Sequence, residues 1–587
     1  MPFSLLPPVE VGSPIPANTP HAVSVTLPTW AANVAYEEGK EWVTSKMTSG
    51  YPRFFVHSII QKLCKFIEDK YARENELSFI FPTYNVACRC RDFIKKHSTN
   101  NPSLRILQLS TPHILSENDE ENESVDASFA VILFPKEEFP LAKAYWQHSG
   151  EGISSRMAEF CLDRFATAGA NIPCGHSNGC TSKPGSKCGG FHKSGNNREF
   201  SVDKSELLSK DDKDTNVFLE ERFGRNLDLS FAAEAKLALR RRISGKINES
   251  SRDASNSSGH TAEISENDVY LYPTGMASIF SAHRAALEVG GNLKSVCYGF
   301  PYVDTKNILT KFGPGLFFFG HGDDQSFEQL KTLLESGEKI LAVFCEFPSN
   351  PLLKSPDLVG IKKLADQYNF FVVVDETVGN FLNIHVLPYA DMVASSLTKV
   401  FSGDSNVMGG SLVLNPNGKR YNQLKETLNK QYEDIFWAED AIYMERNSRD
   451  FAERSAKINN TAEAVAELLK ESPLIKDVFY PKFNPSRKYY DRCKVKNGGY
   501  GGLLSIVFHN PKEAQTFYDA VVTAKGPSLG TNFTLTSPYA ILAHYSELDW
   551  AESFGVDRSL VRISVGLEEK EDLLNTFRAG LAACNTK

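Results

Sequence analysis

Residues 394–410 read ASSLTKVFSGDSNVMGG, and this stretch decides the fold class of the chain. It continues a short apolar run and then enters a glycine-rich loop. A lysine at a strand end, among hydroxyl side chains, suits a Schiff base beside a phosphate group if its amine is neutral. Lys399 is that lysine, and the hydroxyls of Ser396 and Thr398 can donate to phosphate oxygens. Taken alone, the stretch also fits a surface lysine in a loop.

Short apolar runs recur around this stretch, at 295–298, 340–344, 370–374 and 392–395. Each run is followed by polar, Gly-rich or Pro-rich residues and then by helix-like sequence. This alternation predicts the α/β class, with a mostly parallel central sheet that helices cover on both faces. In such sheets, ligands bind where loops leave the C-terminal ends of the strands.

Asp375 ends the apolar run FVVVD, which we expect to be a central parallel strand. A carboxylate at this strand end points into the ligand crevice, and a buried carboxylate needs a positive partner. A protonated pyridine nitrogen would serve, and the charged ring would then act as an electron sink. The alternative is that Asp375 caps the helix that follows.

The segment YPTGMAS (272–278) indicates the other half of a phosphate site. Gly275 and Met276 lie where a loop enters an amphipathic helix, and backbone N–H groups at a helix N-terminus bind anions. Tyr298 follows a strand-like run and offers an aromatic face for the pyridine ring. A tyrosine of the hydrophobic core is the alternative interpretation of Tyr298.

Six motifs follow one another along the chain: TGMAS, CYG, EFPSNP, VVVDET, SSLTK and LVRISVGLE. In this order they resemble the Cys/Met-metabolism enzymes of fold type I, which depend on pyridoxal 5′-phosphate (PLP), over roughly residues 215–580. The segments WQHSGEGISSRMAEF and LEERFGRNLDL are most similar to the fungal cystathionine γ-synthase group, which carries a long N-terminal extension. The resemblance implies a PLP-dependent transferase with a smaller α+β C-terminal domain.

The resemblance also implies a role for each matching position. Lys399 would carry PLP as a Schiff base, Asp375 would pair with the pyridine nitrogen, and Tyr298 would stack on the ring. The implied phosphate ligands are Ser396, Thr398 and the backbone N–H groups of Gly275 and Met276. The other implied roles are Asn350 near the phenolic oxygen, Arg562 as a clamp for the substrate carboxylate, and Ser528 beside that carboxylate.

One position departs from the family pattern, which has a Tyr-x-Arg pair that reaches the phosphate from the neighbouring subunit. The segment that we match to it contains Arg222 but has Glu220 at the tyrosine position. A carboxylate beside a phosphate would repel it unless a cation such as Arg225 intervenes. Because Arg222 is expected to act across a subunit boundary, we expect a homodimer or a homotetramer.

The activity that the resemblance implies is a γ-replacement. An O-acylhomoserine, O-acetyl by analogy with the fungal group, would react with L-cysteine to give L-cystathionine for methionine biosynthesis. The motifs do not separate this reaction from those of a γ-lyase, a β-lyase or an O-acetylhomoserine sulfhydrylase. A catalytically degenerate interaction protein is a further alternative.

Length and composition limit the number of domains and the kinds of partner that we expect. Its 587 residues predict several domains, and the net charge of −8 disfavours nucleic acid and membrane surfaces. We expect an N-terminal extension at 1–200, a PLP-binding domain at 201–415 with a flexible insertion near 245–267, and a small domain at 416–587. The N-terminus has no signal-like segment, and eleven irregularly spaced cysteines suggest reduced thiols, so we expect a cytoplasmic enzyme with a possible nuclear pool.

Cysteine and histidine side chains gather in one Gly/Ser-rich segment. Both are zinc ligands, but the spacing is irregular and has no C-x₂-C pair. We therefore expect a flexible loop without metal at Cys174, His176, Cys180, Cys188 and His192.

Overall fold

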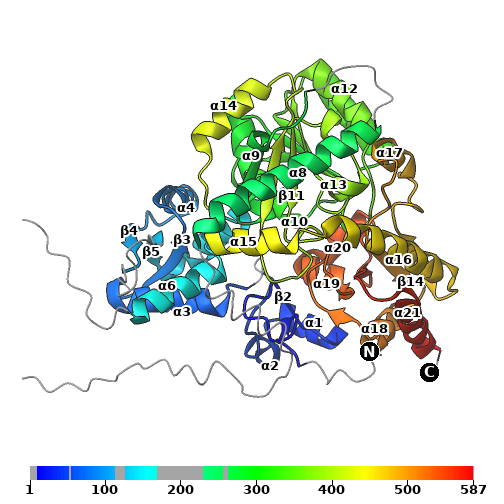
Figure 1. Ribbon diagram of the computed structural model, residues 1–587, viewed down its shortest axis with the longest axis horizontal. Coiled ribbons are helices and arrows are strands. Elements are labelled where there is room, and N and C mark those ends of the chain that lie inside the picture. Colours follow the sequence, from blue (N-terminus) through cyan, green and yellow to red (C-terminus); the bar gives the residue numbers. More distant parts are fainter. Residues whose placement is uncertain (1–9, 52–54, 113–125, 168–228, 255–261, 586–587) are drawn as a thin grey trace, which may run out of the picture.

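The computed structural model describes residues 10–51, 55–112, 126–167, 229–254 and 262–585 (Figure 1). Three sheets with their own helices organise this part of the chain, together with a short N-terminal hairpin of β1 (Pro14–Ile15) and β2 (Ser24–Val25). None of the described helices combines the length and apolar character that a membrane crossing requires.

The central sheet has seven strands in the order β6-β12-β11-β10-β9-β7-β8. The prediction of a mostly parallel sheet is confirmed, and only β12 runs antiparallel to its neighbours within the sheet. The strands are β6 (Val269–Tyr272), β7 (Ser295–Tyr298), β8 (Leu316–Phe319), β9 (Ala342–Glu346), β10 (Phe371–Asp375), β11 (Met392–Ser396) and β12 (Gly410–Leu414).

Helices cover both faces of this sheet, which explains why its strands are apolar on both sides. In β10, Val372 and Val374 face one hydrophobic cluster, whereas Phe371 and Val373 face the other. The first cluster includes α8 (Ala232–Ala254), α11 (Asp324–Glu335), α12 (Leu358–Tyr368), α13 (Asn380–Asn383) and α15 (Ala438–Asn447). The second includes α9 (Gly275–Gly290), α10 (Val303–Lys311) and α14 (Tyr421–Gln431).

A smaller α+β unit follows, as the sequence predicted, around a five-stranded sheet of order β13-β14-β17-β16-β15. Its strands are β13 (Ile475–Phe479), β14 (Leu503–Phe508), β15 (Ala524–Lys525), β16 (Leu535–Pro538) and β17 (Val561–Ser564). Its helices are α16 (Phe451–Glu471), α17 (Arg487–Cys493), α18 (Pro511–Ala520), α19 (Tyr539–His544), α20 (Leu548–Ser553) and α21 (Lys570–Cys584). The N-terminal helix α1 (Trp30–Glu37) packs on this unit, where Trp30 N–H donates to Asp519 at 2.7 Å, and α2 (Glu41–Thr44) follows it.

A three-stranded antiparallel sheet of order β3-β5-β4 forms the N-terminal domain, on the left of Figure 1. Its strands are β3 (Glu76–Phe81), β4 (Arg105–Ser110) and β5 (Ser128–Pro135). One face packs on α3 (Ser58–Tyr71) and α6 (Ser155–Thr167), and the other on α4 (Tyr84–His97) and α5 (Phe139–Ser149).

One local expectation differs from the structure. The insertion expected near 245–267 is helical up to Ala254, because α8 continues through this region and buries Ile247 in the core. Two helices, α15 and α16, connect the central sheet to the C-terminal unit. The chain leaves α15 at Ser448, whose hydroxyl donates to Met444 O at 2.7 Å.

Candidate active site

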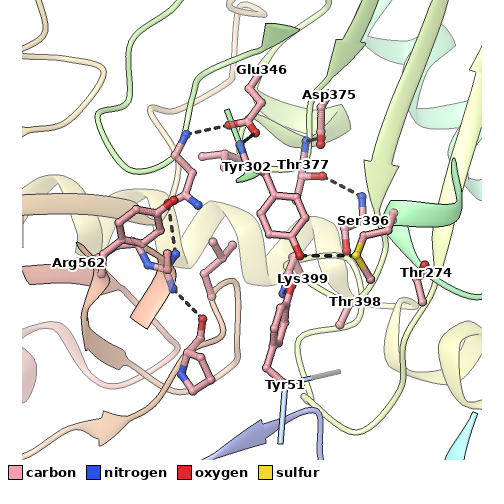
Figure 2. A pocket seen from close by; sticks show the side chains of 18 of the residues that line it. Tyr51, Thr274, Tyr302, Glu346, Asp375, Thr377, Ser396, Thr398, Lys399 and Arg562 are labelled. Carbon is pink, nitrogen blue, oxygen red and sulfur yellow. Dashed lines mark hydrogen bonds between the residues drawn. The ribbon is translucent and has the colours of Figure 1, made fainter. Parts of the chain in front are cut away.

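A pocket lies at the C-terminal edge of the central sheet, where β10 ends at Asp375 and β11 ends at Ser396 (Figure 2). The strand register pairs Asp375 with Glu346 on one side and with Ala394 on the other. The pocket opens to solvent, and residues of the C-terminal unit form its far wall.

Lys399 lies in the loop after β11 and is only 6% exposed, so its interpretation as a surface lysine is wrong. Its amine donates to the Tyr51 hydroxyl and to the Ser528 hydroxyl, both at 3.3 Å. It also lies 4.6 Å from the centre of the Tyr51 ring. No carboxylate pairs with it among the described residues, so the amine faces the pocket outside any ion pair.

Asp375 is half-buried at the end of β10, and desolvation raises the pKa of its carboxyl group. Its side chain accepts from Thr377 N–H at 2.9 Å, but the next helix, α13, begins only at Asn380. Asp375 is therefore not the cap of a helix. No lysine or arginine in the described part of the chain pairs with it, which leaves a carboxylate that a protonated pyridine nitrogen would neutralise.

Two further buried carboxyl groups surround Asp375. Burial, and then the charge of Asp375, raise the pKa of Glu346 to about 8 and that of Glu376 to about 8. Glu346 accepts from the backbone N–H groups of Tyr302 and Asn350, the latter at 2.9 Å. The end of the sheet therefore concentrates acidic groups where a cationic ring would be stabilised.

The predicted phosphate site occupies the N-terminus of α9. Thr274 caps this helix, and Gly275 and Met276 begin it with backbone N–H groups that face the pocket. A Cβ atom on Gly275 would lie 2.6 Å from the Cβ of Ser396, so only glycine allows this close approach. Ser396 and Thr398 both line the pocket, as predicted, although the Thr398 hydroxyl also accepts from Gly409 N–H at 3.1 Å.

Tyr298 does not line the pocket, so its predicted stacking position is wrong. Its ring belongs to the hydrophobic core, and its hydroxyl donates to Asp323 O at 2.9 Å. Tyr302 takes this place instead, with its hydroxyl 3.7 Å from the sulfur of Met276 (Figure 2). The sequence analysis favoured Tyr298 because it ends a strand, whereas Tyr302 enters through the turn after it.

Arg562, on β17, is buried in the far wall of the pocket. Its guanidinium donates to Asn350 Oδ1 at 3.2 Å and to the carbonyls of Pro527 and Ser528 at 2.9 and 2.8 Å. Burial lowers its pKa, and no carboxylate pairs with it in the described residues. The predicted cluster of Arg562, Asn350 and Ser528 is thus assembled, and its cation is available to a substrate carboxylate.

Tyr51 is a further pocket residue that the sequence analysis missed, because it lies far upstream of the other motifs. The signal was present, since Tyr51, Pro52 and Arg53 have the Tyr-x-Arg spacing that was sought at Glu220. Arg222 and Glu220 lie outside the described residues, as do Arg53 and the expected Cys/His loop.

The buried lysine, the unpaired carboxylate and the helix N-terminus fit the amine, ring and phosphate contacts of PLP, and together they define a PLP-dependent enzyme. The profile described as "Cys/Met metabolism PLP-dependent enzyme" matches residues 260–582. A second profile, "Fungal trans-sulfuration enzyme, N-terminal domain", matches residues 59–154. The chain belongs to the Cys/Met metabolism family of PLP-dependent enzymes.

Curated relatives extend over the full chain. A cystathionine γ-synthase of Neurospora crassa is 47% identical, over 98% of this chain and 98% of its own length. A cystathionine γ-synthase-like enzyme of Amanita muscaria is 41% identical, over 98% of this chain and 96% of its own. Among solved structures, a cystathionine γ-synthase of Xanthomonas oryzae pv. oryzae is 27% identical, over 54% of this chain and 81% of its own, with a TM-score of 0.47.

Proposed function

We propose that the protein is a cystathionine γ-synthase, which joins an O-acylhomoserine to L-cysteine with release of the acyl group as a carboxylate. The observation that supports this most strongly is the 47% identity to the Neurospora crassa enzyme over nearly the whole of both chains. The test is to supply O-acetylhomoserine and cysteine to the purified protein and to measure cystathionine. Absence of this product would contradict the proposal.

When bound, PLP supplies an electron sink for charge that develops at the substrate Cα. Lys399 is the base that moves a proton at this carbon, since its amine lies in the pocket without a counter-charge. Asp375 would hold the proton on the ring nitrogen, and Arg562 would orient the substrate through its carboxylate. The acyl group then leaves Cγ, and the cysteine sulfur takes its place.

We also propose that Tyr51 and Arg53 form the Tyr-x-Arg pair, in place of Glu220 and Arg222. The support is the 3.3 Å contact between the Tyr51 hydroxyl and the Lys399 amine. Arg53→Ala should then weaken PLP binding, whereas Arg222→Ala should leave it unchanged. If only Arg222→Ala weakened PLP binding, Arg222 rather than Arg53 would be the arginine of the pair.

A second candidate is another reaction of the family, since the Amanita muscaria relative at 41% identity is described only as cystathionine γ-synthase-like. Three parallel assays separate these functions: O-acetylhomoserine with cysteine, with sulfide, and with no nucleophile. We expect cysteine to be the preferred partner and O-acetyl to be preferred over O-succinyl. A higher rate with sulfide would identify a sulfhydrylase, and release of a keto acid without nucleophile would identify a lyase.

For the assembly, we propose a homodimer or homotetramer, as the family resemblance implies. Sedimentation of the holoenzyme, with activity measured across the fractions, tests this assembly. Activity in the fractions of a dimer or a tetramer would support it. A catalytically competent monomer in sedimentation would contradict the proposed assembly.

We place the enzyme in the cytoplasm, with a possible nuclear pool. The support is that the eight described cysteines are free thiols, as a reducing compartment favours. Imaging of a fluorescent fusion tests this location, and a signal confined to an organelle would contradict it.

A further inference from the structure

A short segment of the N-terminal domain, His148 to Glu151, contacts the helices behind the PLP pocket, and we call it the 148–151 segment. It begins with the last two residues of α5 and continues into the turn after this helix. Its residues contact the first turns of α9 and α10. The first turn of α9 forms the predicted phosphate site, and α10 begins directly after Tyr302.

Gly150 contacts the phosphate side of the pocket. Its carbonyl accepts from the Thr274 hydroxyl at 3.1 Å, and the same hydroxyl accepts from Ala277 N–H at 3.0 Å to cap α9. Gly150 has φ = 65°, and a Cβ atom there would lie 2.2 Å from Thr274 Oγ1 and 2.9 Å from Ala277 N. The contact therefore requires glycine and fixes the orientation of the cap.

His148 contacts α10, the helix that follows Tyr302. Its Nδ1 lies 2.8 Å from Oδ1 of Asp304, in the first turn of this helix and two residues after Tyr302. Its Nε2 lies 2.8 Å from the amine of Lys311. Because a charged lysine only donates, Nε2 accepts and the N–H at Nδ1 donates to Asp304. His148 and Asp304 are both buried, at 5% and 0% exposure.

The segment itself is fixed by the N-terminal domain. Arg89 of α4 donates to both carboxylate oxygens of Glu151, at 2.6 and 3.2 Å, and the Tyr145 hydroxyl donates to Glu151 at 2.7 Å. Arg89 also donates to Glu433 at 3.1 Å, outside the N-terminal domain. Short polar contacts thus connect this domain to the first turns of both α9 and α10.

We propose that the N-terminal domain is a positioning module for the cofactor: His148 and Gly150 hold the first turns of α10 and α9 at the spacing that PLP requires. This role rests on the assignment of the pocket to PLP, but not on the acyl donor, the nucleophile or the product. His148 and Gly150 are positioning residues, since neither lines the PLP pocket together with Lys399.

The test is a titration of the cofactor-free full-length protein with PLP, followed by absorbance and needing no turnover. His148→Ala should raise the dissociation constant for PLP about tenfold, because it removes the contact with a buried carboxylate. His148→Asn retains a donor near the position of Nδ1 and should recover most of this affinity. Gly150→Ala should weaken binding independently, from the α9 side.

Asp440→Asn is the matched control. Asp440 pairs with Arg156 at 3.1 Å, so this change disturbs another buried ion pair between the N-terminal domain and the rest of the chain. This pair joins α6 to α15 rather than to α9 or α10. It should lower the Tm but leave the PLP dissociation constant within about twofold of wild type. If His148→Ala and Gly150→Ala lower the Tm and bind PLP as wild type does, the positioning role is wrong. Wild-type protein that binds PLP but makes no cystathionine would overturn only the proposed function.

Discussion

The two walls of the pocket are built differently. The sheet wall presents Lys399, Asp375 and Ser396 at or next to the ends of hydrogen-bonded strands, where the register fixes their spacing. The opposite wall presents Tyr51, from a loop near the N-terminus, and Arg562, from β17 of the smaller sheet, two segments that are distant from the sheet wall in the sequence. We infer that the sheet wall performs the chemistry, whereas the opposite wall positions what is bound.

The largest effect is expected on the sheet wall, from Lys399→Ala. Loss of the base should reduce kcat by about 10³-fold or more. Lys525→Ala is the control, since Lys525 is a buried lysine outside the pocket whose pKa burial lowers to about 8. Equal losses of activity in both variants would contradict a specific role of Lys399 in the chemical step.

Asp375→Asn should be the next most harmful change. An amide cannot neutralise a protonated ring nitrogen, so we expect kcat to fall by about 10²-fold. Asp391→Asn provides the control, because Asp391 precedes β11 and accepts from Val372 N–H at 2.8 Å. The assignment fails if Asp375→Asn retains wild-type turnover.

On the opposite wall, Arg562→Lys should act on binding. The two-pronged contact with the substrate carboxylate is lost, so KM for O-acetylhomoserine should rise about 10- to 100-fold with a smaller change in kcat. Steady-state kinetics measure both parameters. A lower kcat at constant KM would place Arg562 in the chemical step instead.

Tyr302→Ala should weaken PLP binding about tenfold, because it removes the aromatic ring from the pocket. Tyr298→Phe is the internal comparison, since it removes only the hydroxyl that donates to Asp323. It should cost about 1 kcal/mol of stability and leave PLP affinity unchanged. If Tyr298→Phe affected PLP affinity and Tyr302→Ala did not, the original sequence assignment would be restored.

The smallest effect is a pH dependence of stability in the cofactor-free protein. Glu376 has a pKa of about 8 when folded, because it is buried near Asp375, against an ordinary value of 4.5. The folded state therefore holds its proton more tightly, and stability falls as pH rises from about 4.5 through 8, by at most about 1.4 kcal/mol per pH unit. Glu376→Gln should flatten the fall in Tm between pH 6 and 9. The exposed control Glu426→Gln should retain the wild-type slope, and a slope unchanged by Glu376→Gln would contradict the shift.

The sequence predicted the sheet wall well because strand ends have a local signature. An apolar run that stops at Asp375 or before Lys399 specifies both the burial and the edge of the sheet. Tyr302 and Tyr51 have no such signature, since their positions depend on a turn and on the packing of an N-terminal segment against the C-terminal unit. The antiparallel direction of β12 was also not predicted, because an apolar run does not encode strand direction.

The most direct test of the central claim is to reduce the holoenzyme with borohydride, digest it and map the modified peptide by mass spectrometry. Reduction makes the carbon–nitrogen bond between PLP and its lysine permanent. We predict a single phosphopyridoxyl group on Lys399. Modification of another lysine, or of none, would contradict the assignment of this pocket.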